Sequence, residues 1–297
     1  MKEPASIKQP PLLRLSSFLT SKARGRLSRP LERVLYKYKV PIPNARLVNR
    51  KLLKIGVLHP EVFSPAFPEF LKAQFPTDYA RIIERANNAC NLVFDLLGSG
   101  PVDLNSVKAR PDLRFYLRRG RDTIWTPGHV GGKVPWHFDF KAGIGWDPRT
   151  FFTDIRYGDA VGIDVKIPWE LSRGHHLVTL GQAYQLTKTE RYAECLCDLI
   201  LDWIRQNPPK FGVNWSSPME VAIRASNWLV AWQLVEKSTS VPRGFESQLI
   251  QSLWEHGCHL WRHLEWGRRL STNHLIANLA GLGFFWASHS AGKSGLY

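Results

Sequence analysis

The sequence predicts an all-α protein built of antiparallel helical hairpins. After Trp169, five segments have apolar residues at helical spacing, short Pro- or Gly-containing turns separate most of them, and no strong strand pattern falls between them. With 297 residues and a 44% hydrophobic composition, the chain can bury a large core. We therefore expect neighbouring helices to pack against one another in pairs.

Residues 1–58 are expected to form a basic, partly disordered arm. Residues 1–54 hold 14 Lys and Arg against only Glu3 and Glu32, which leaves 26 basic and 23 acidic residues for the rest of the chain. An anionic surface could attract this arm, but no zinc finger or aromatic-interleaved module accompanies the charge. We do not expect specific nucleic-acid binding, although a nucleic-acid-binding arm stays as one alternative.

The chain contains no segment that we expect to span a membrane or to be a secretion signal. Leu12–Leu19 is too short and too polar for a signal peptide, and no later apolar run reaches membrane-span length without charge. The four cysteines include no Cys-x-x-Cys pair, so reduced thiols are expected. The sequence indicates a cytoplasmic protein as written, or a periplasmic or secreted one if it is exported. We expect no cofactor.

Residues 59–168 are expected to combine one helix with an irregular segment that packs on the hairpins. The pattern predicts a helix over Asp78–Leu97, ended by Gly98 and Gly100. The segment from Pro101 to Pro168 is rich in Gly, Pro, Asp and Trp and has short strand-like runs such as Val161–Ile167. The segment contains Trp125, Trp136 and Trp146, and Trp169 follows it directly. These four tryptophans either pack over helix ends or line a groove.

Residues 169–297 are expected to hold the helical hairpins. Ser217-Pro218-Met219-Glu220 predicts a capping box with proline in the first turn, and Ser271 or Thr272 is expected to cap the last helix. The predicted helices are Leu171–Leu186, Glu190–Gln206, a third from Ser217 to about Glu236, Glu246–Trp266, and a fifth from Asn273 to Trp286.

Three polar residues form one stripe on the third of these helices. Glu220, Arg224 and Asn227 are spaced i, i+4, i+7, and apolar residues flank them on both sides. The stripe is therefore expected to face either a shared cavity or a buried network in which Glu220 pairs with Arg224 and Asn227 is hydrogen-bonded.

The histidines of the fourth helix superficially resemble a metal-binding face, but we expect no metal there. His256, His259 and His263 lie at i, i+3, i+7, whereas one helix normally offers only an i, i+4 pair, and no His-Glu-x-x-His motif is present.

Asn273 and His274 open the fifth helix, where the positive end of the helix dipole favours a bound anion such as a carboxylate. The alternative is that Asn273 is a second capping residue and His274 a buried, hydrogen-bonded histidine.

Several segments together resemble the heparinase II/III family of polysaccharide lyases. They are Asp164–Arg173 with its Pro-Trp-Glu-Leu-Ser-Arg run, Trp203, Asn214–Glu220 with Arg224 and Asn227-Trp228, and Asn273-His274, in that order. The resemblance implies an (α/α) toroid, here incomplete, that acts on uronic-acid-containing polysaccharide by β-elimination. It also implies that Asn273 and His274 are catalytic and that the substrate-binding residues are Arg224, Glu220, Asn227, Trp215, Trp169 and Arg173.

The family's catalytic tyrosine and a histidine from its C-terminal β-sandwich have no counterpart before Tyr297, so we expect a truncated toroid that lacks the sandwich and has little turnover alone. Two alternatives remain besides the nucleic-acid-binding arm. One is a non-catalytic glycan-binding or scaffold module. The other is a toroid glycosidase, which needs two carboxylates across the cleft, with Glu220 as the obvious candidate.

Overall fold

The computed structural model describes residues 63–108, 114–116, 122–124, 134–157, 162–265 and 273–290. The chain divides into two units, residues 1–44 and 45–297, and all described residues belong to the second. The basic arm up to residue 62, Trp125, and the expected caps Ser271 and Thr272 lie outside the described residues. The expected domain boundaries at 58 and 168 stay predictions.

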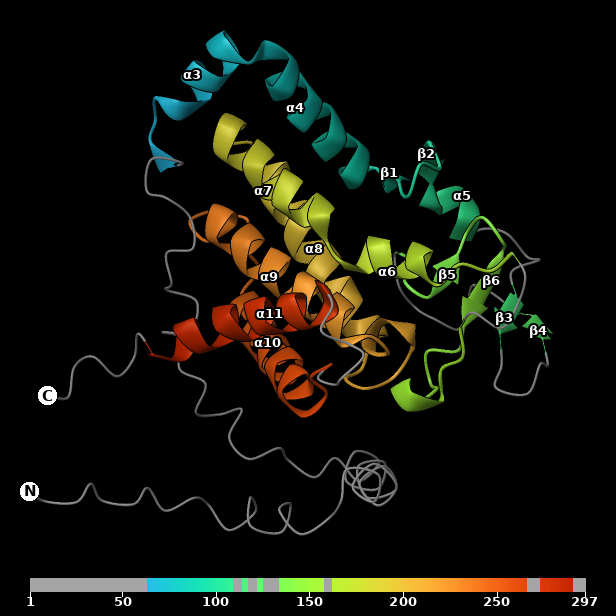
Figure 1. The fold of residues 1–297 in the computed structure, drawn as a ribbon. Helices are drawn as coiled ribbons and strands as arrows, with labels where there is room; N and C mark the ends of the chain where they lie inside the picture. The colour runs from blue at the N-terminus through green and yellow to red at the C-terminus, as the bar shows by residue number, and fades with distance from the viewer. Residues whose placement is uncertain are drawn as a thin grey trace, which may run out of the picture. The chain divides into compact units, whose positions relative to one another are not determined.

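The described residues are mainly helical, as the sequence predicts, and their long helices lie in two layers (Figure 1). Helices α4 (Pro76–Cys90), α7 (His175–Thr187), α9 (Pro218–Val235) and α11 (Asn273–Ser290) contact one another in that order. Helices α8 (Glu190–Gln206) and α10 (Phe245–Arg262) contact each other and pack on α7 and α9, respectively. The chain thus alternates between the layers, which is the arrangement expected of stacked helical hairpins.

Two close approaches hold the first of these layers together. A Cβ atom at Gly181 of α7 would lie 2.8 Å from Leu234 of α9, and one at Gly281 of α11 would lie 2.8 Å from the Cβ of Ala222, also on α9. Only a residue without a side chain fits at such contacts, so these two glycines set the distances of α7 and α11 from α9.

Two small sheets and three short helices complete the described fold. Strands β1 (Val93–Asp95) and β2 (Pro101–Asp103) form an antiparallel hairpin in which Phe94 pairs with Val102. The other sheet has the order β4-β3-β6-β5, with β3 and β6 parallel and its other pairs antiparallel. Its strands are β3 (Arg114–Tyr116), β4 (Asp122–Ile124), β5 (Phe138–Asp139) and β6 (Ile144–Trp146), and the short helices are α3 (Phe67–Gln74), α5 (Leu104–Lys108) and α6 (Lys166–Ser172). Two 3-10 turns, η5 (Phe152–Asp154) and η6 (Val213–Trp215), precede α6 and α9.

A buried carboxylate fastens the segment from residue 134 to the end of α8. Asp202 accepts hydrogen bonds from the Val134 backbone N–H (3.1 Å), from Trp136 Nε1 (3.0 Å) and from Gln206 Nε2 (2.7 Å). Trp136 and Trp146 are almost fully buried, so of the two roles expected for these tryptophans, packing is the one observed.

Three predicted helices differ from the observed ones because the backbone turns earlier than the apolar pattern indicates. The helix expected over Glu246–Trp266 ends at Arg262. The helix expected over Asp78–Leu97 ends at Cys90, since Leu92 takes a φ of 59° and the next residues pair with β2 instead. The helix expected over Leu171–Leu186 is divided into α6 and α7 by Gly174, whose φ is 74°.

Smaller predictions were also wrong. Within Val161–Ile167 the described residues form no strand, and Lys166 and Ile167 belong to α6. The expected capping box is not formed, because the Ser217 side chain makes no capping hydrogen bond and the Glu220 carboxylate turns toward another helix. By contrast, α8 has the predicted bounds, and α11 begins at Asn273 as expected.

In the part of the chain that the structure describes, no helix is long and apolar enough to cross a membrane.

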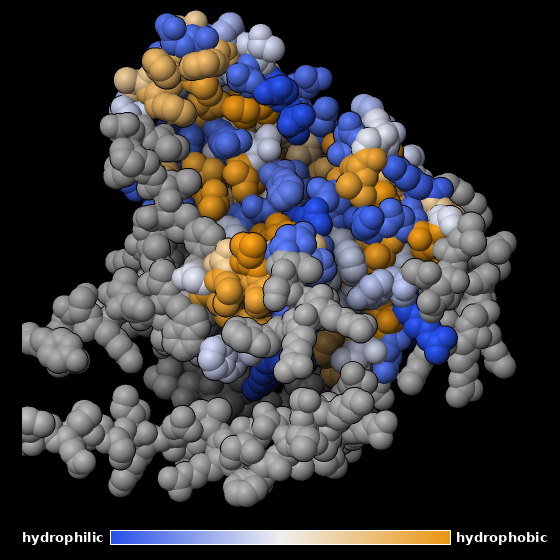
Figure 2. All heavy atoms as spheres, viewed as in Figure 1, coloured by the Kyte–Doolittle hydropathy of each residue, from blue (hydrophilic) through white to orange (hydrophobic). Residues whose placement is uncertain are grey.

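Apolar side chains are exposed on the surface of α11 and of α3 (Figure 2). Ile276 and Leu279 are 70% and 50% exposed. The side chains of Phe284, Phe285 and Trp286 lie outside the described part of the chain.

Candidate functional site

The first turn of α11 carries the two residues predicted to be catalytic, and Glu265 holds one of them in place. Asn273 is exposed, and the His274 side chain is 39% exposed. The Glu265 carboxylate accepts a hydrogen bond from His274 Nδ1 at 2.9 Å and one from Asn278 Nδ2 at 3.2 Å. Because a carboxylate only accepts, this contact places the ring proton on Nδ1 and fixes the orientation of the imidazole.

Glu265 itself is held by α11, since its backbone N–H donates to Asn278 Oδ1 at 3.0 Å. Asn278 has no exposed surface, so its two hydrogen bonds hold the Glu265 carboxylate in a fixed position. The result is an oriented carboxylate–histidine pair beside an exposed amide, which is an arrangement suited to moving a proton.

An aromatic pair joins the loop after η5 to α6. Tyr157, in the loop after η5, is 43% exposed, and its ring meets the Trp169 ring edge-to-face at 5.1 Å. Burial and, secondly, the negative charge of Glu265 raise the pKa of Tyr157. A negative charge on Glu265 therefore disfavours ionisation of the Tyr157 hydroxyl. Trp169 is fixed in turn by a 2.9 Å hydrogen bond from its Nε1 to the Val213 carbonyl.

Arg173 connects the end of α6 with two residues of the predicted polar stripe. Its Nε and Nη2 donate to the two carboxylate oxygens of Glu220 at 2.7 and 3.0 Å, and its Nη1 donates to Glu170. Asn227 Nδ2 donates to the Arg173 carbonyl at 2.9 Å. The hydrogen bonds from Arg173 to Glu220 raise the pKa of the guanidinium. Glu220, only 1% exposed, thus pairs with Arg173 and not with Arg224 as expected.

Arg224 lies in the core, in a box of tryptophan rings. Its guanidinium is 4.2 Å from the centre of the Trp203 ring and 5.5 Å from that of Trp215. Arg224 Nε donates to His256 Nε2 at 2.8 Å, and Nη2 donates to the Asn214 carbonyl at 3.1 Å. Since Arg224 and Trp215 have no exposed surface, neither touches solvent at the candidate site.

Burial decides the protonation of this core pair. Desolvation lowers the pKa of Arg224 to about 9, while the charge of Glu220 opposes the change. Desolvation, reinforced by the charge of Arg224, lowers the pKa of His256 well below 6.5. A neutral His256 whose Nδ1 donates to the Ser252 carbonyl can accept from Arg224 at Nε2, so the pair is a cation bonded to a neutral imidazole.

His256, His259 and His263 do not form a metal-binding set. Both ring nitrogens of His256 are engaged by Arg224 and Ser252. The rings of His259 and His263 pack on Phe152 with centroids 5.0 and 4.9 Å away. Among the described residues, no group of three or more His, Cys, Asp or Glu is placed to hold a metal ion.

The structure therefore divides the eight predicted site residues into three sets. Asn273, His274 and Trp169 are exposed or partly exposed, whereas Arg224 and Trp215 lie fully buried in the core. Arg173, Glu220 and Asn227 form a bonded unit between α6 and α9. Sequence reasoning missed Glu265 and Tyr157, because Glu265 fell inside a predicted helix and Tyr157 inside the irregular segment.

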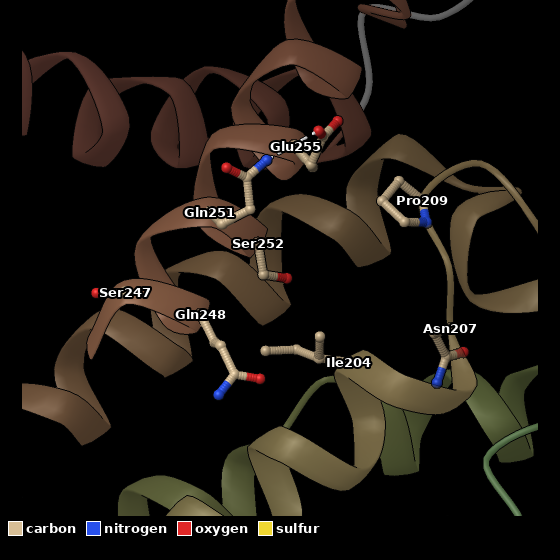
Figure 3. A pocket seen from close by; sticks show the side chains of 8 residues that line it. All are labelled: Ile204, Asn207, Pro209, Ser247, Gln248, Gln251, Ser252 and Glu255. Atoms are coloured by element: carbon tan, nitrogen blue, oxygen red, sulfur yellow. Dashed lines mark hydrogen bonds between the residues drawn. The ribbon is translucent and has the colours of Figure 1, made fainter. Parts of the chain in front are cut away.

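A cavity of about 310 Å³ lies elsewhere, between the end of α8 and α10 (Figure 3). None of the eight predicted site residues lines it. Its walls are Ile204, Asn207, Pro209, Ser247, Gln248, Gln251, Ser252 and Glu255.

The described part of the chain is a module of layered helical hairpins, with an exposed amide and a carboxylate–histidine pair at the first turn of α11 and a partly exposed aromatic pair, Tyr157 and Trp169. Residues 129–287, more than half of the chain, match the family described as "Heparinase II/III N-terminus". The chain therefore belongs to the heparinase II/III N-terminal family, which confirms the resemblance seen in the sequence and relates the chain to polysaccharide lyases. No curated protein and no solved structure matches it. All eight predicted site residues fall within the matched range.

Proposed function

We propose that this module binds uronic-acid-containing polysaccharide at the first turn of α11 and takes part in its cleavage by β-elimination. The observation that supports this most is the exposed Asn273 beside a His274 side chain that Glu265 orients. Membership of the heparinase II/III N-terminal family supports a polysaccharide as the substrate class.

The chemistry of β-elimination needs the groups that this surface offers. Removing the proton at C5 of a uronate places negative charge on its carboxyl group, and hydrogen-bond donors must stabilise that charge. The Asn273 amide and the N–H groups of the first turn of α11 are such donors. His274, held by Glu265, is the proposed group that accepts or donates the proton.

The aromatic pair is the proposed platform for the sugar rings. Tyr157 and Trp169 are both partly exposed, and their rings and polar groups together suit the mixed apolar and polar faces of a sugar. In this proposal Arg173, Glu220 and Asn227 position α6 against α9, and Arg224 and Trp215 keep the base of the site rigid.

A glycosidase on the same helical fold is less well supported. Its leading candidate carboxylate, Glu220, is almost fully buried and accepts two hydrogen bonds from Arg173. A buried carboxylate whose two oxygens both accept hydrogen bonds from a guanidinium is poorly placed to reach and protonate a leaving oxygen.

The test is binding of uronate oligosaccharides to the full chain and to Asn273→Ala, measured by calorimetry. Removing the amide should weaken binding by about 1–3 kcal/mol, or about 5- to 150-fold in Kd, as expected for a hydrogen bond to a charged group. The control is Asn88→Ala on α4, which should bind like the wild type. Equal binding by both variants and the wild type would contradict the assignment of Asn273.

The same oligosaccharides also test the reaction, because β-elimination creates a conjugated unsaturated uronate that absorbs ultraviolet light. In any form of the protein that shows turnover, His274→Ala should slow product formation more than it weakens binding. If uronates bind at Asn273 and no form of the protein gives an absorbance increase, the module is a glycan-binding one. Equal turnover by His274→Ala and the wild type would exclude His274 as the proton-transfer group.

A further inference from the structure

Two of the four cysteines face each other where α4 meets α8. Cys90 is the last residue of α4 and Cys195 lies in the middle of α8. Both are free and only partly buried, and they are neighbours, because each thiol is the first cause of the other's pKa shift. They are 105 residues apart in the sequence, so only the packing of α4 on α8 brings the two sulfurs together.

Two hydrogen bonds near the cysteines hold α4 and α8 in this position. Tyr192 Oη donates to Asn87 Oδ1 at 3.0 Å, and Arg191 Nη2 donates to Asn91 Oδ1 at 3.0 Å. Asn87 and Asn91 flank Cys90 on one face near the end of α4, and Arg191 and Tyr192 lie one helical turn before Cys195 on α8. These two hydrogen bonds therefore fix the spacing of α4 and α8 close to the two thiols.

From this geometry we propose that Cys90 and Cys195 form a reversible disulfide that links α4 to α8. The oxidant is a small disulfide of the glutathione class. The Cys90 thiolate attacks one sulfur of that disulfide and releases one small thiolate, and Cys195 then attacks the mixed disulfide at the Cys90 sulfur and releases the second. The two protein thiols lose two protons and two electrons, and the small disulfide gains them as two thiols.

The surroundings of the pair support this order of attack. The hydrogen bond from Cys195 lowers the pKa of Cys90 against the effect of burial, and the charge of Arg191 lowers it further. The same contact with Cys90, together with burial, raises the pKa of Cys195. Once Cys90 has become a mixed disulfide its negative charge is gone, so Cys195 can lose its proton more readily.

The other two cysteines, Cys197 and Cys258, have raised pKa values, whereas the pKa of Cys90 is lowered. Burial raises the pKa of Cys258 to about 11 and that of Cys197 to about 12. Cys258 is partly buried like Cys90, which makes it the matched control for exposure, and its charged neighbours are Arg262, Glu255 and Lys210.

The experiment counts the thiols of the native full chain before and after equilibration with glutathione disulfide, with peptide mapping by mass spectrometry. The wild type and Cys258→Ser should each lose two thiols, and the mapped link should join Cys90 to Cys195. Cys195→Ser should instead carry a glutathione adduct at Cys90, and Cys90→Ser should keep its three thiols. The oxidised wild type should also unfold at a higher temperature than the reduced form, because the disulfide closes a long loop of the unfolded chain.

Other outcomes overturn the proposal. They are a wild type that keeps all four thiols, a link that includes Cys197 or Cys258, a disulfide between two chains, or an adduct on Cys258 in the Cys195→Ser variant. Circular dichroism of each serine variant before oxidation checks that it is folded, and the Cys258→Ser result shows whether a serine substitution by itself prevents oxidation.

Discussion

Gly281→Ala should disturb the contact that seats α11 on α9 and thereby the position of Asn273 and His274. A Cβ atom at residue 281 would lie 2.8 Å from Ala222 Cβ, 3.0 Å from Ala222 Cα and 3.3 Å from Leu260 Cδ1. The first two are the side-chain methyl group and the backbone Cα of Ala222 on α9, and neither can rotate away. The helices must therefore separate for the methyl group to fit.

The cost can be worked from a matched pair of glycines on the same helix. Overpacking at residue 281 should cost about 1–3 kcal/mol, while the better helix propensity of alanine returns about 1 kcal/mol. At Gly283, two residues further along α11, no described atom lies within 4 Å of an added Cβ. Gly283→Ala should therefore show the propensity gain alone, and the two variants should differ by about 1–3 kcal/mol in stability.

Urea unfolding followed by circular dichroism measures this difference, and calorimetry with uronate oligosaccharides measures its effect on the site. Gly281→Ala should unfold at lower urea than Gly283→Ala and bind the oligosaccharide more weakly. Equal midpoints, or a more stable Gly281→Ala, would refute the packing of α11 on α9. Lower stability with unchanged binding would keep that packing and refute the site on α11.

Two further predictions concern the core. Asp202→Ala should destabilise the fold by roughly 2–5 kcal/mol, because it leaves the donors on Val134 and Trp136 unpaired, and urea unfolding equal to wild type would contradict this. Burial lowers the pKa of His137 to about 4 and the pKa values of His256 and His259 well below 6.5. The unfolded chain then binds more protons, so stability should fall as the pH drops from about 6.5 toward 4, by up to about 1.4 kcal/mol per pH unit for each histidine. A urea midpoint that is the same at pH 7 and pH 5 would show that these histidines are not buried in neutral form.

Local patterns were enough to predict the helices whose ends are marked by the chain itself. The bounds of α8 follow from its apolar stripe and the Asn-Pro-Pro that ends it, and Pro218 marks the start of α9. The family resemblance was also available from the sequence, since it rests on the order and spacing of short motifs that the match over residues 129–287 confirms.

The partners of the polar residues could not be predicted, because they come from other helices. Helical spacing alone favours Glu220 with Arg224, but the turn at Gly174 brings Arg173 to Glu220 and leaves Arg224 to His256 and the tryptophans. The same holds for Glu265, which meets His274 only because α10 ends before residue 265 and α11 packs back on α9. The sequence by itself determined where most of the long helices lie and which family the chain belongs to. The tertiary structure alone decided which charges meet, because those pairings depend on distances between helices that no local pattern encodes.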